Sequence, residues 1–175
     1  MSNYLVVSII ANDSPGLAEQ FSTLTSQNNC NIEDSRMAVM GHEFSVSLLV
    51  SGSDADIHQC EQDFMAMAER DNHLVICRHT EENQGQMASL PYAIQTISLD
   101  APGIIRNVTD FLKRNEINIS NLIANSYKAP HTGAPMLEIQ LTANIPSQVQ
   151  ITRFREEFAD FCDELQIDAA FEPIR

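Results

Sequence analysis

Apolar and polar residues alternate in two series along the chain, and the two series have the same order. Short apolar stretches rich in β-branched residues, at 5–11 and 93–99, each run into an Asp-x-Pro-Gly sequence, which is typical of a strand that ends in a turn. In such a turn Asp or Ser can cap a helix, and Pro suits the first helical position. We therefore expect a helix to start at each turn.

The segments that follow have the spacing of amphipathic helices, with apolar residues three and four positions apart. Each half contains two such segments. The predicted apolar stripes are Leu17, Phe21, Leu24 and Ile57, Cys60, Phe64, Met67 in the first half, and Ile104, Val108, Phe111 and Ile151, Phe154, Phe158, Phe161 in the second. Each apolar stripe must pack against a sheet to be buried.

Extended segments separate the two helices of each half. We expect them around 31–40 and 118–127, then alternating strands at 44–50 and 137–141, and short last strands near 74–78 and 169–172. The order βαββαβ, found twice, predicts an α+β chain of two ferredoxin-like modules in tandem. Because the two helices cover only one face of each small sheet, the other face is left uncovered. We therefore expect the modules to pair with each other or with another chain.

Two short motifs recur with one spacing. Asp13-Ser-Pro-Gly-Leu17 returns as Asp100-Ala-Pro-Gly-Ile104, and Asn28-Asn-Cys-Asn-Ile32 returns as Asn115-Glu-Ile-Asn-Ile119, both 87 residues later. A single gap-free offset indicates a duplication. A polar stretch between the halves has the composition of a linker. We expect a first module at 1–80, a linker at 81–90 and a second module at 91–175.

Acidic residues outnumber basic ones, 24 to 10, and the net charge is −14. So few basic residues argue against a surface that neutralises many DNA phosphates, and we do not expect direct binding to nucleic acid. Residues 1–87 carry a net charge of −10 and residues 88–175 carry −4. We expect repulsion to limit how the first halves of two chains meet, which favours homodimer formation through other surfaces.

The apolar run at 5–11 is short, contains Ser8 and has no basic segment before it. It matches neither a signal peptide nor a membrane span, so we expect a cytoplasmic protein. The four cysteines are spread singly, and none forms a Cys-x-x-Cys pair. We expect reduced, buried thiols that serve packing.

The repeated turns carry the candidate chemistry. A glycine just inside each helix would leave backbone N–H groups open to a carboxylate, and the nearby aspartate could hold an ammonium group. We expect the asparagine that opens the next strand to return close to the same turn. The candidate ligand-binding residues are Asp13, Ser14, Gly16 and Asn31 in the first half, and Asp100, Ala101, Gly103 and Asn118 in the second. The alternative is that these residues serve only as a helix start and a strand turn.

No P-loop, nucleophile elbow or His-Glu-x-x-His motif occurs, so we expect neither an enzyme nor a cofactor. His58-x-Cys60 and Cys77-x-His79 could supply four zinc ligands. However, Cys60 belongs to an apolar stripe, and a spacing of two residues puts His58 on another face of the helix. We therefore expect no metal site.

These residues resemble the ACT domain family, small βαββαβ modules that commonly bind amino acids and regulate metabolism. The family pattern of Asp or Asn, any residue, Pro-Gly, and Asn-Ile about fifteen residues later is met by both halves. The matching positions are Asp13, Pro15, Gly16, Asn31, Ile32 and Asp100, Pro102, Gly103, Asn118, Ile119. The resemblance implies that the two aspartates and the two asparagines contact an amino acid, usually where two modules meet.

A closer resemblance covers almost the whole chain. Cys30-Asn-Ile-Glu-Asp-Ser-Arg36, Gly41, Glu43-Phe44 and Ser51-Gly52 are similar to the glycine cleavage system transcriptional repressor family. This implies a repressor that does not touch DNA but binds a LysR-type activator of the glycine cleavage operon, with glycine relieving the repression. The second half departs more, with a longer hairpin at 127–135. The alternatives are a ligand-independent protein-interaction module and a regulator of another amino-acid pathway.

Overall fold

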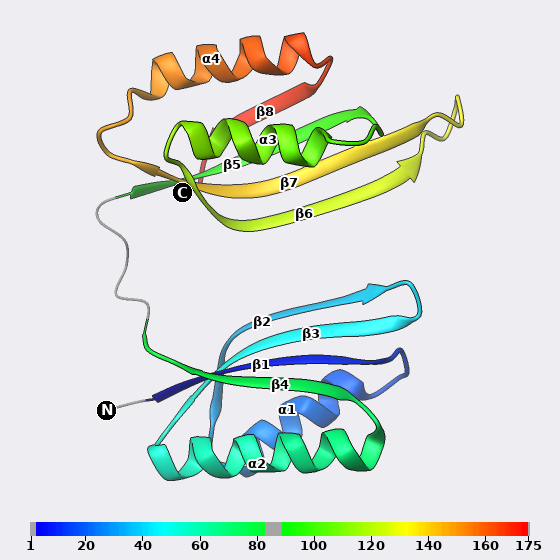
Figure 1. Ribbon diagram of the computed structural model, residues 1–175, viewed down its shortest axis with the longest axis vertical. Helices are drawn as coiled ribbons and strands as arrows, with labels where there is room; N and C mark the ends of the chain where they lie inside the picture. The colour runs from blue at the N-terminus through cyan, green and yellow to red at the C-terminus, as the bar shows by residue number, and fades with distance from the viewer. Residues whose placement is uncertain (1–2, 83–88, 175) are drawn as a thin grey trace. The chain divides into compact units, whose positions relative to one another are not determined.

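The computed structural model describes residues 3–82 and 89–174, and the chain divides into two compact units, 1–84 and 85–175 (Figure 1). Each unit is a module with its own core. The first module consists of β1 (Asn3–Asn12), α1 (Leu17–Gln27), β2 (Asn31–Met40), β3 (Glu43–Gly52), α2 (Asp54–Asp71) and β4 (Leu74–Thr80). These are the elements that the apolar pattern predicts, in the predicted order.

The second module repeats this order. It consists of β5 (Ser89–Leu99), α3 (Ile104–Arg114), β6 (Asn118–Lys128), β7 (Pro135–Pro146), α4 (Ile151–Glu164) and β8 (Asp168–Pro173). Within the expected linker at 81–90, residues 83–88 lie outside the described residues, and Ser89 and Leu90 belong to β5.

Both sheets are antiparallel, with strand orders β2-β3-β1-β4 and β6-β7-β5-β8. The two helices of each module lie on one face of its sheet (Figure 1). This confirms the α+β fold of two ferredoxin-like βαββαβ modules. The order also places one strand between β1 and β2, and likewise between β5 and β6, and this spacing decides where the candidate site residues lie.

Alternate strand residues build the two cores. Leu5, Val7 and Ile9 of β1 are almost completely buried against the helices, and the predicted stripe of α2 is buried throughout. In the other helices the third or fourth position of the stripe was wrong by one residue. The buried residues there are Thr25, Leu112 and Cys162, and their neighbours Leu24, Phe111 and Phe161 are only partly buried.

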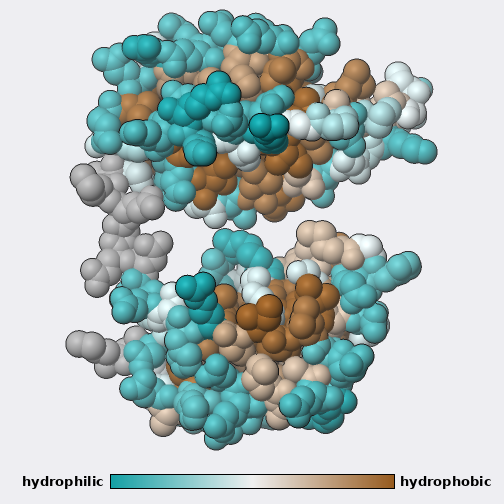
Figure 2. Space-filling model, viewed as in Figure 1, coloured by the Kyte–Doolittle hydropathy of each residue, from teal (hydrophilic) through white to brown (hydrophobic). Residues whose placement is uncertain are grey.

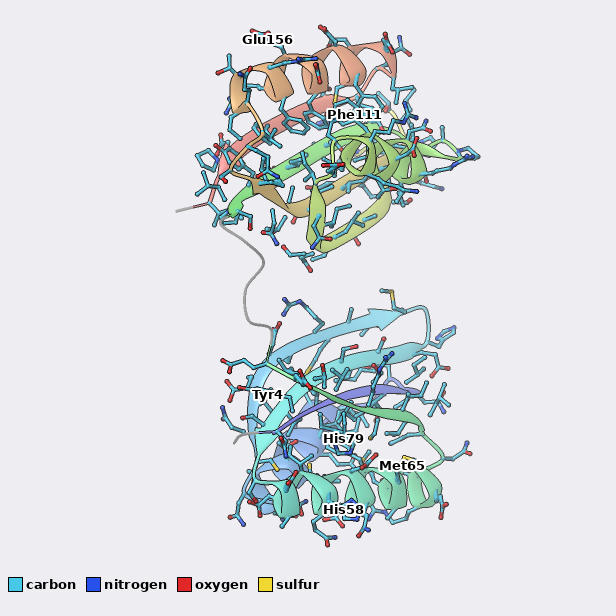
Figure 3. The ribbon with its side chains drawn as sticks, turned by 60° about the vertical axis from the view of Figure 1, so that its left-hand side comes forward. Tyr4, His58, Met65, His79, Phe111 and Glu156 are labelled. Carbon is cyan, nitrogen blue, oxygen red and sulfur yellow. The ribbon has the colours of Figure 1, made fainter. Side chains whose placement is uncertain are left out.

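Thr25 can occupy a core position because its hydroxyl donates to the carbonyl oxygen of Phe21 at 2.9 Å, so no polar group is left unpaired. A pattern search that counts only apolar residues therefore passes over it. Phe111 is partly exposed, yet its ring lies within 4.6 to 5.8 Å of the rings of Phe154, Phe158 and Phe161, measured between centroids (Figure 3). The second core thus contains a cluster of aromatic rings, although most of its buried residues are aliphatic, as in the first core.

The cysteines are free thiols, of which Cys30, Cys60 and Cys162 are buried and Cys77 is half-buried. Burial raises the pKa of Cys60 to about 12 and that of Cys77 to about 11. Both thiols therefore stay protonated at neutral pH. None of the helices in the described ranges is long and apolar enough to span a membrane.

Candidate functional site

The two Asp-x-Pro-Gly turns have the same backbone geometry. Gly16 has a φ of 98° and Gly103 a φ of 96°, both in the left-handed region, and the helix begins at the next residue. The glycine is therefore the N-cap and does not lie inside the helix, and no side chain caps either helix start. The expectation of an Asp or Ser cap with Pro in the first helical position was wrong. The turn needs glycine because a Cβ is strained at this φ.

Each turn is fixed to the neighbouring hairpin by one backbone hydrogen bond. The N–H of Asp13 donates to the carbonyl oxygen of His42 at 3.0 Å, and that of Asp100 donates to the carbonyl oxygen of Pro135 at 2.9 Å. A Cβ placed on Gly16 or Gly103 would meet nothing within 4 Å. The surface of both turns is therefore open, and a small molecule can approach the backbone there.

In the second module a hollow of about 510 Å³ lies at this turn. Its lining consists of Asp100, Ala101, Pro102, Gly103, Ile104, Ile105 and Arg106, with Ser126 from β6 and Leu137 from β7. Three predicted site residues of this half, the aspartate, the alanine and the glycine, thus line one hollow. The sequence did not indicate Arg106 and Ser126, because neither belongs to the repeated motif, and the first half has Glu19 at the position of Arg106.

The hollow combines two features that suit a carboxylate. The first N–H groups of α3 have no partners within the helix, and the helix dipole is positive at this end. Arg106 adds a full positive charge in the same turn, and among the residues that the structure describes no acidic group lies within ion-pairing distance of it. Asp100, on the same wall, offers a carboxylate for an ammonium group.

The asparagines lie far from these turns, and the expectation that each returns close to its own turn was wrong. Asn31 pairs with Ser51 across β2 and β3, and Ser51 pairs with Tyr4 at the start of β1. Asp13 follows the other end of β1, nine residues later, which is roughly 30 Å along the strand. Because β3 runs between β1 and β2, the start of β2 lies level with the start of β1.

The second module has the same arrangement. Asn118 pairs with Asn144, which pairs with Pro91 near the start of β5, and Asp100 follows β5 at its far end. No single module therefore brings its aspartate and its asparagine together. A ligand that touches both kinds of residue must take them from two different modules.

Asn31 is held by an acidic neighbour. Its Nδ2 donates to Oε1 of Glu33 at 3.1 Å, and the hydroxyl of Ser51 donates to the same oxygen. These two hydrogen bonds, that from Ser51 above all, hold the pKa of Glu33 below its usual value. Glu33 is thus an ionised carboxylate beside Asn31, and it was not singled out from the sequence. In the second module the position 87 residues later is Ser120.

Two of the five histidines contact polar side chains on the surface. Nε2 of His79 on β4 lies 2.9 Å from Oε2 of Glu61 on α2, and the His58 ring contacts Gln62 at 3.0 Å on the same helix (Figure 3). Within 3–82 and 89–174, no group of three or more His, Cys, Asp or Glu side chains is placed to hold a metal ion.

Comparison with known proteins places this geometry in a family. The ACT domain family matches residues 3–75. The glycine cleavage system transcriptional repressor of Escherichia coli K12 is 31% identical over 164 residues, which cover 93% of this chain and 86% of that protein.

Two solved structures share the fold of the whole chain. One, an unknown protein from Galdieria sulphuraria, has 22% identity and a TM-score of 0.82, and covers 100% of both chains. The other is described as a glycine cleavage system transcriptional repressor, with 23% identity and a TM-score of 0.74, and covers 100% of this chain and 99% of that one. Together with the repeated motifs and the tandem modules, these matches show that the chain belongs to the ACT domain family of glycine cleavage system transcriptional repressors.

Proposed function

We propose that this chain is an amino-acid-responsive repressor of the glycine cleavage operon, which acts by binding a LysR-type activator and not DNA. Glycine is the ligand that relieves repression. The observation that carries the amino-acid site is the open hollow at the Asp100 turn, where a carboxylate, a cation and the start of a helix meet.

The hollow fits the two charges of an amino acid. The carboxylate of the ligand accepts from the first backbone N–H groups of α3 and lies near Arg106, while its ammonium group lies near Asp100. A backbone without a side chain at Gly103 lets the ligand approach closely. Asn31 or Asn118 joins the site only when it is supplied by a second module, so that ligand binding is coupled to how modules pair.

The charge of the chain supports a protein partner in place of DNA. The net charge is −14, and in the described part of the chain Arg36, Arg70, Arg114 and Arg153 are each paired with an acidic side chain. Cations already neutralised by the protein release few counterions from DNA. An acidic surface instead attracts a basic region of a partner protein.

Calorimetric titration of the full chain with glycine and serine tests the ligand. We expect heat with glycine, and loss of it in Asp100→Ala but not in Asp160→Ala, a matched change on the exposed side of α4. No heat at millimolar glycine, with unchanged folding, would contradict amino-acid binding. A mobility-shift assay with operator DNA, with and without the activator, tests the partner. We expect this chain to change the mobility of the DNA only when the activator is present.

A second candidate function is a protein-interaction module that ignores amino acids. The observation that favours it is the separation of the aspartate and asparagine within each module, which leaves no complete site in one module. A pull-down of the activator with and without glycine distinguishes the two. Equal capture in both cases would support the ligand-independent module.

A further inference from the structure

The sheet of the first module has one face that neither helix of this module covers (Figure 1). Residues that alternate with the buried ones point to this face, and among them Ile10, Leu74 and Ile76 are 43%, 57% and 59% exposed. They lie side by side, since Ile10 pairs with Leu74 and Ser8 pairs with Ile76. Figure 2 shows brown side chains gathered over β1 and β4 of this module. An exposed apolar group of this kind marks an interaction surface.

This face is also free of most of the module's negative charge. The first 87 residues carry −10, but the helices behind the sheet hold seven of the 13 acidic residues, Glu19 on α1 and Asp54, Asp56, Glu61, Asp63, Glu69 and Asp71 on α2. Of the three basic residues in this half, Arg36 and Arg78 lie on the open face. The repulsion expected between two first halves is therefore weaker where two open faces meet.

One row of this face is complementary to itself. Arg78 on β4, Val6 on β1, Leu49 on β3 and Asp34 on β2 form one row across the sheet. Suppose that two copies pack with their open faces together, related by a two-fold axis that runs parallel to the strands and midway between β1 and β3. Strand β4 of one copy then lies over β2 of the other. In that row Arg78 then faces Asp34, and Val6 faces Leu49, twice over. Like the sheets of a sandwich, the two faces would lie about 10 Å apart.

The surface offers room for this contact. A shallow hollow of about 130 Å³ beside Asp34 is lined by Val6, Arg36, Ser47 and Leu49 among others. Asp34 is ion-paired with Arg36 of its own strand, so Arg78 of a second copy would share this carboxylate with Arg36. Arg78 is exposed, and within the described residues no acidic group lies within ion-pairing distance of it. We infer that the open face of the first module is a homodimer interface, in which Arg78 of each copy enters the hollow beside Asp34 of the other. This inference is independent of the proposed ligand and of the transcriptional role.

The open face of the second module is not built in this way. Its centre holds Glu138, whose Oε1 accepts from Gln95 at 2.7 Å and from Gln140 at 2.8 Å. These hydrogen bonds, that from Gln140 first, keep the pKa of Glu138 below its usual value, so the carboxylate is ionised at neutral pH. Asp168 and Glu172 of β8 point to the same face. Two such faces would bury like charges against each other, which is unfavourable.

Sedimentation velocity of the full chain over a dilution series tests the interface. We expect a dimer, and an increase of at least about tenfold in its dissociation constant for Ile76→Glu, Arg78→Asp and Asp34→Arg. The combined Arg78→Asp/Asp34→Arg variant restores opposite charges and is expected to dimerise nearly as well as the parent chain. Two matched controls, Met65→Glu on α2 (45% exposed) and Ile123→Glu on the open face of the second module (48% exposed), should leave the dimer intact.

Rescue by the combined variant separates an interface from misfolding, since a variant that fails to fold is not repaired by a second surface charge. A chain that stays monomeric throughout the series would overturn the inference. A loss of dimer in Ile123→Glu equal to that in Ile76→Glu would also overturn it, because the two kinds of face would then be pairing with each other. Tighter dimerisation of the Asp34→Arg variant would also overturn the inference, because Asp34 would then face an acidic surface of the other copy and not Arg78.

Discussion

Glu19 and Arg106 occupy the same position in the two modules, in the first turn of α1 and of α3, and they carry opposite charges. The start of a helix attracts anions through its free N–H groups and its dipole. Glu19 already places a carboxylate in that field, whereas Arg106 strengthens it. The two repeated turns are thus unequal as carboxylate sites, although their glycines have nearly the same φ.

The first prediction follows from this difference. Arg106→Glu should weaken binding of glycine by at least about tenfold, since it replaces an attraction by a repulsion within a helix turn of the ligand carboxylate. Calorimetric titration measures the change. Lys113→Glu, at the other end of α3, alters the net charge equally and should change the affinity little. Equal losses in the two variants would assign the effect to overall charge and not to a contact.

The second prediction concerns the backbone of the turn. Gly103→Ala should lower the free energy of unfolding by about 1–2 kcal/mol, because an alanine is strained at a φ of 96°. The cost is conformational alone, since the added Cβ meets nothing within 4 Å. Urea denaturation measures it. Gly103→Asn should cost less, because asparagine adopts the left-handed region more readily, and a larger loss for asparagine would contradict this account.

The duplication made the fold predictable from the sequence. The apolar stripe of α2 at Ile57, Cys60, Phe64 and Met67 and the alternation in β1 are local patterns that report directly which side faces the core. The same offset of 87 residues identified the turns at Gly16 and Gly103. What these patterns encode is the type of each element and the face that it buries.

The candidate site could be predicted only in part, because it depends on strand order. A sequence gives β1, β2 and β3 in succession, but the insertion of β3 between the other two puts Asn31 and Asp13 at opposite ends of the sheet. Glu33 was missed for a related reason. Its role comes from Ser51, a residue 18 positions away on the paired strand. Such relationships between strands are not visible in the spacing of a single motif.

The third prediction concerns close packing at the end of β3. A Cβ on Gly52 would lie 2.9 Å from Sγ of the buried Cys30, which is closer than real contacts allow. Gly52→Ala should therefore destabilise the protein by about 1–3 kcal/mol through overpacking. Cys30→Ala removes the sulfur, so the double variant should be more stable than the sum of the two single losses predicts. Strict additivity in urea denaturation would show that the clash is relieved in another way.

The last prediction concerns the stability of the first module at acid pH. Nε and Nη2 of Arg70 each donate to Asp71 at 2.8 Å, and Nε2 of Gln20 on α1 donates to the same carboxylate at 2.8 Å. The hydrogen bonds from Arg70 above all lower the pKa of Asp71 to about 2, from an ordinary value of 3.8. A carboxyl with a lowered pKa stabilises the folded state above its unfolded pKa, and this contribution is lost as the pH falls from about 4 to about 2.

An NMR titration of the side-chain carboxyl groups should therefore show Asp71 with a midpoint near 2 in the parent chain, and Arg70→Gln should move that midpoint up towards 3.8. Arg114→Gln, which removes the partner of Asp110 in the other module, should leave the Asp71 midpoint in place and raise that of Asp110. If Asp71 titrated near 3.8 in the parent chain, the hydrogen bonds from Arg70 and Gln20 would not favour its ionised form in the folded state. The first module would then lose no stability between pH 4 and pH 2 through this carboxyl.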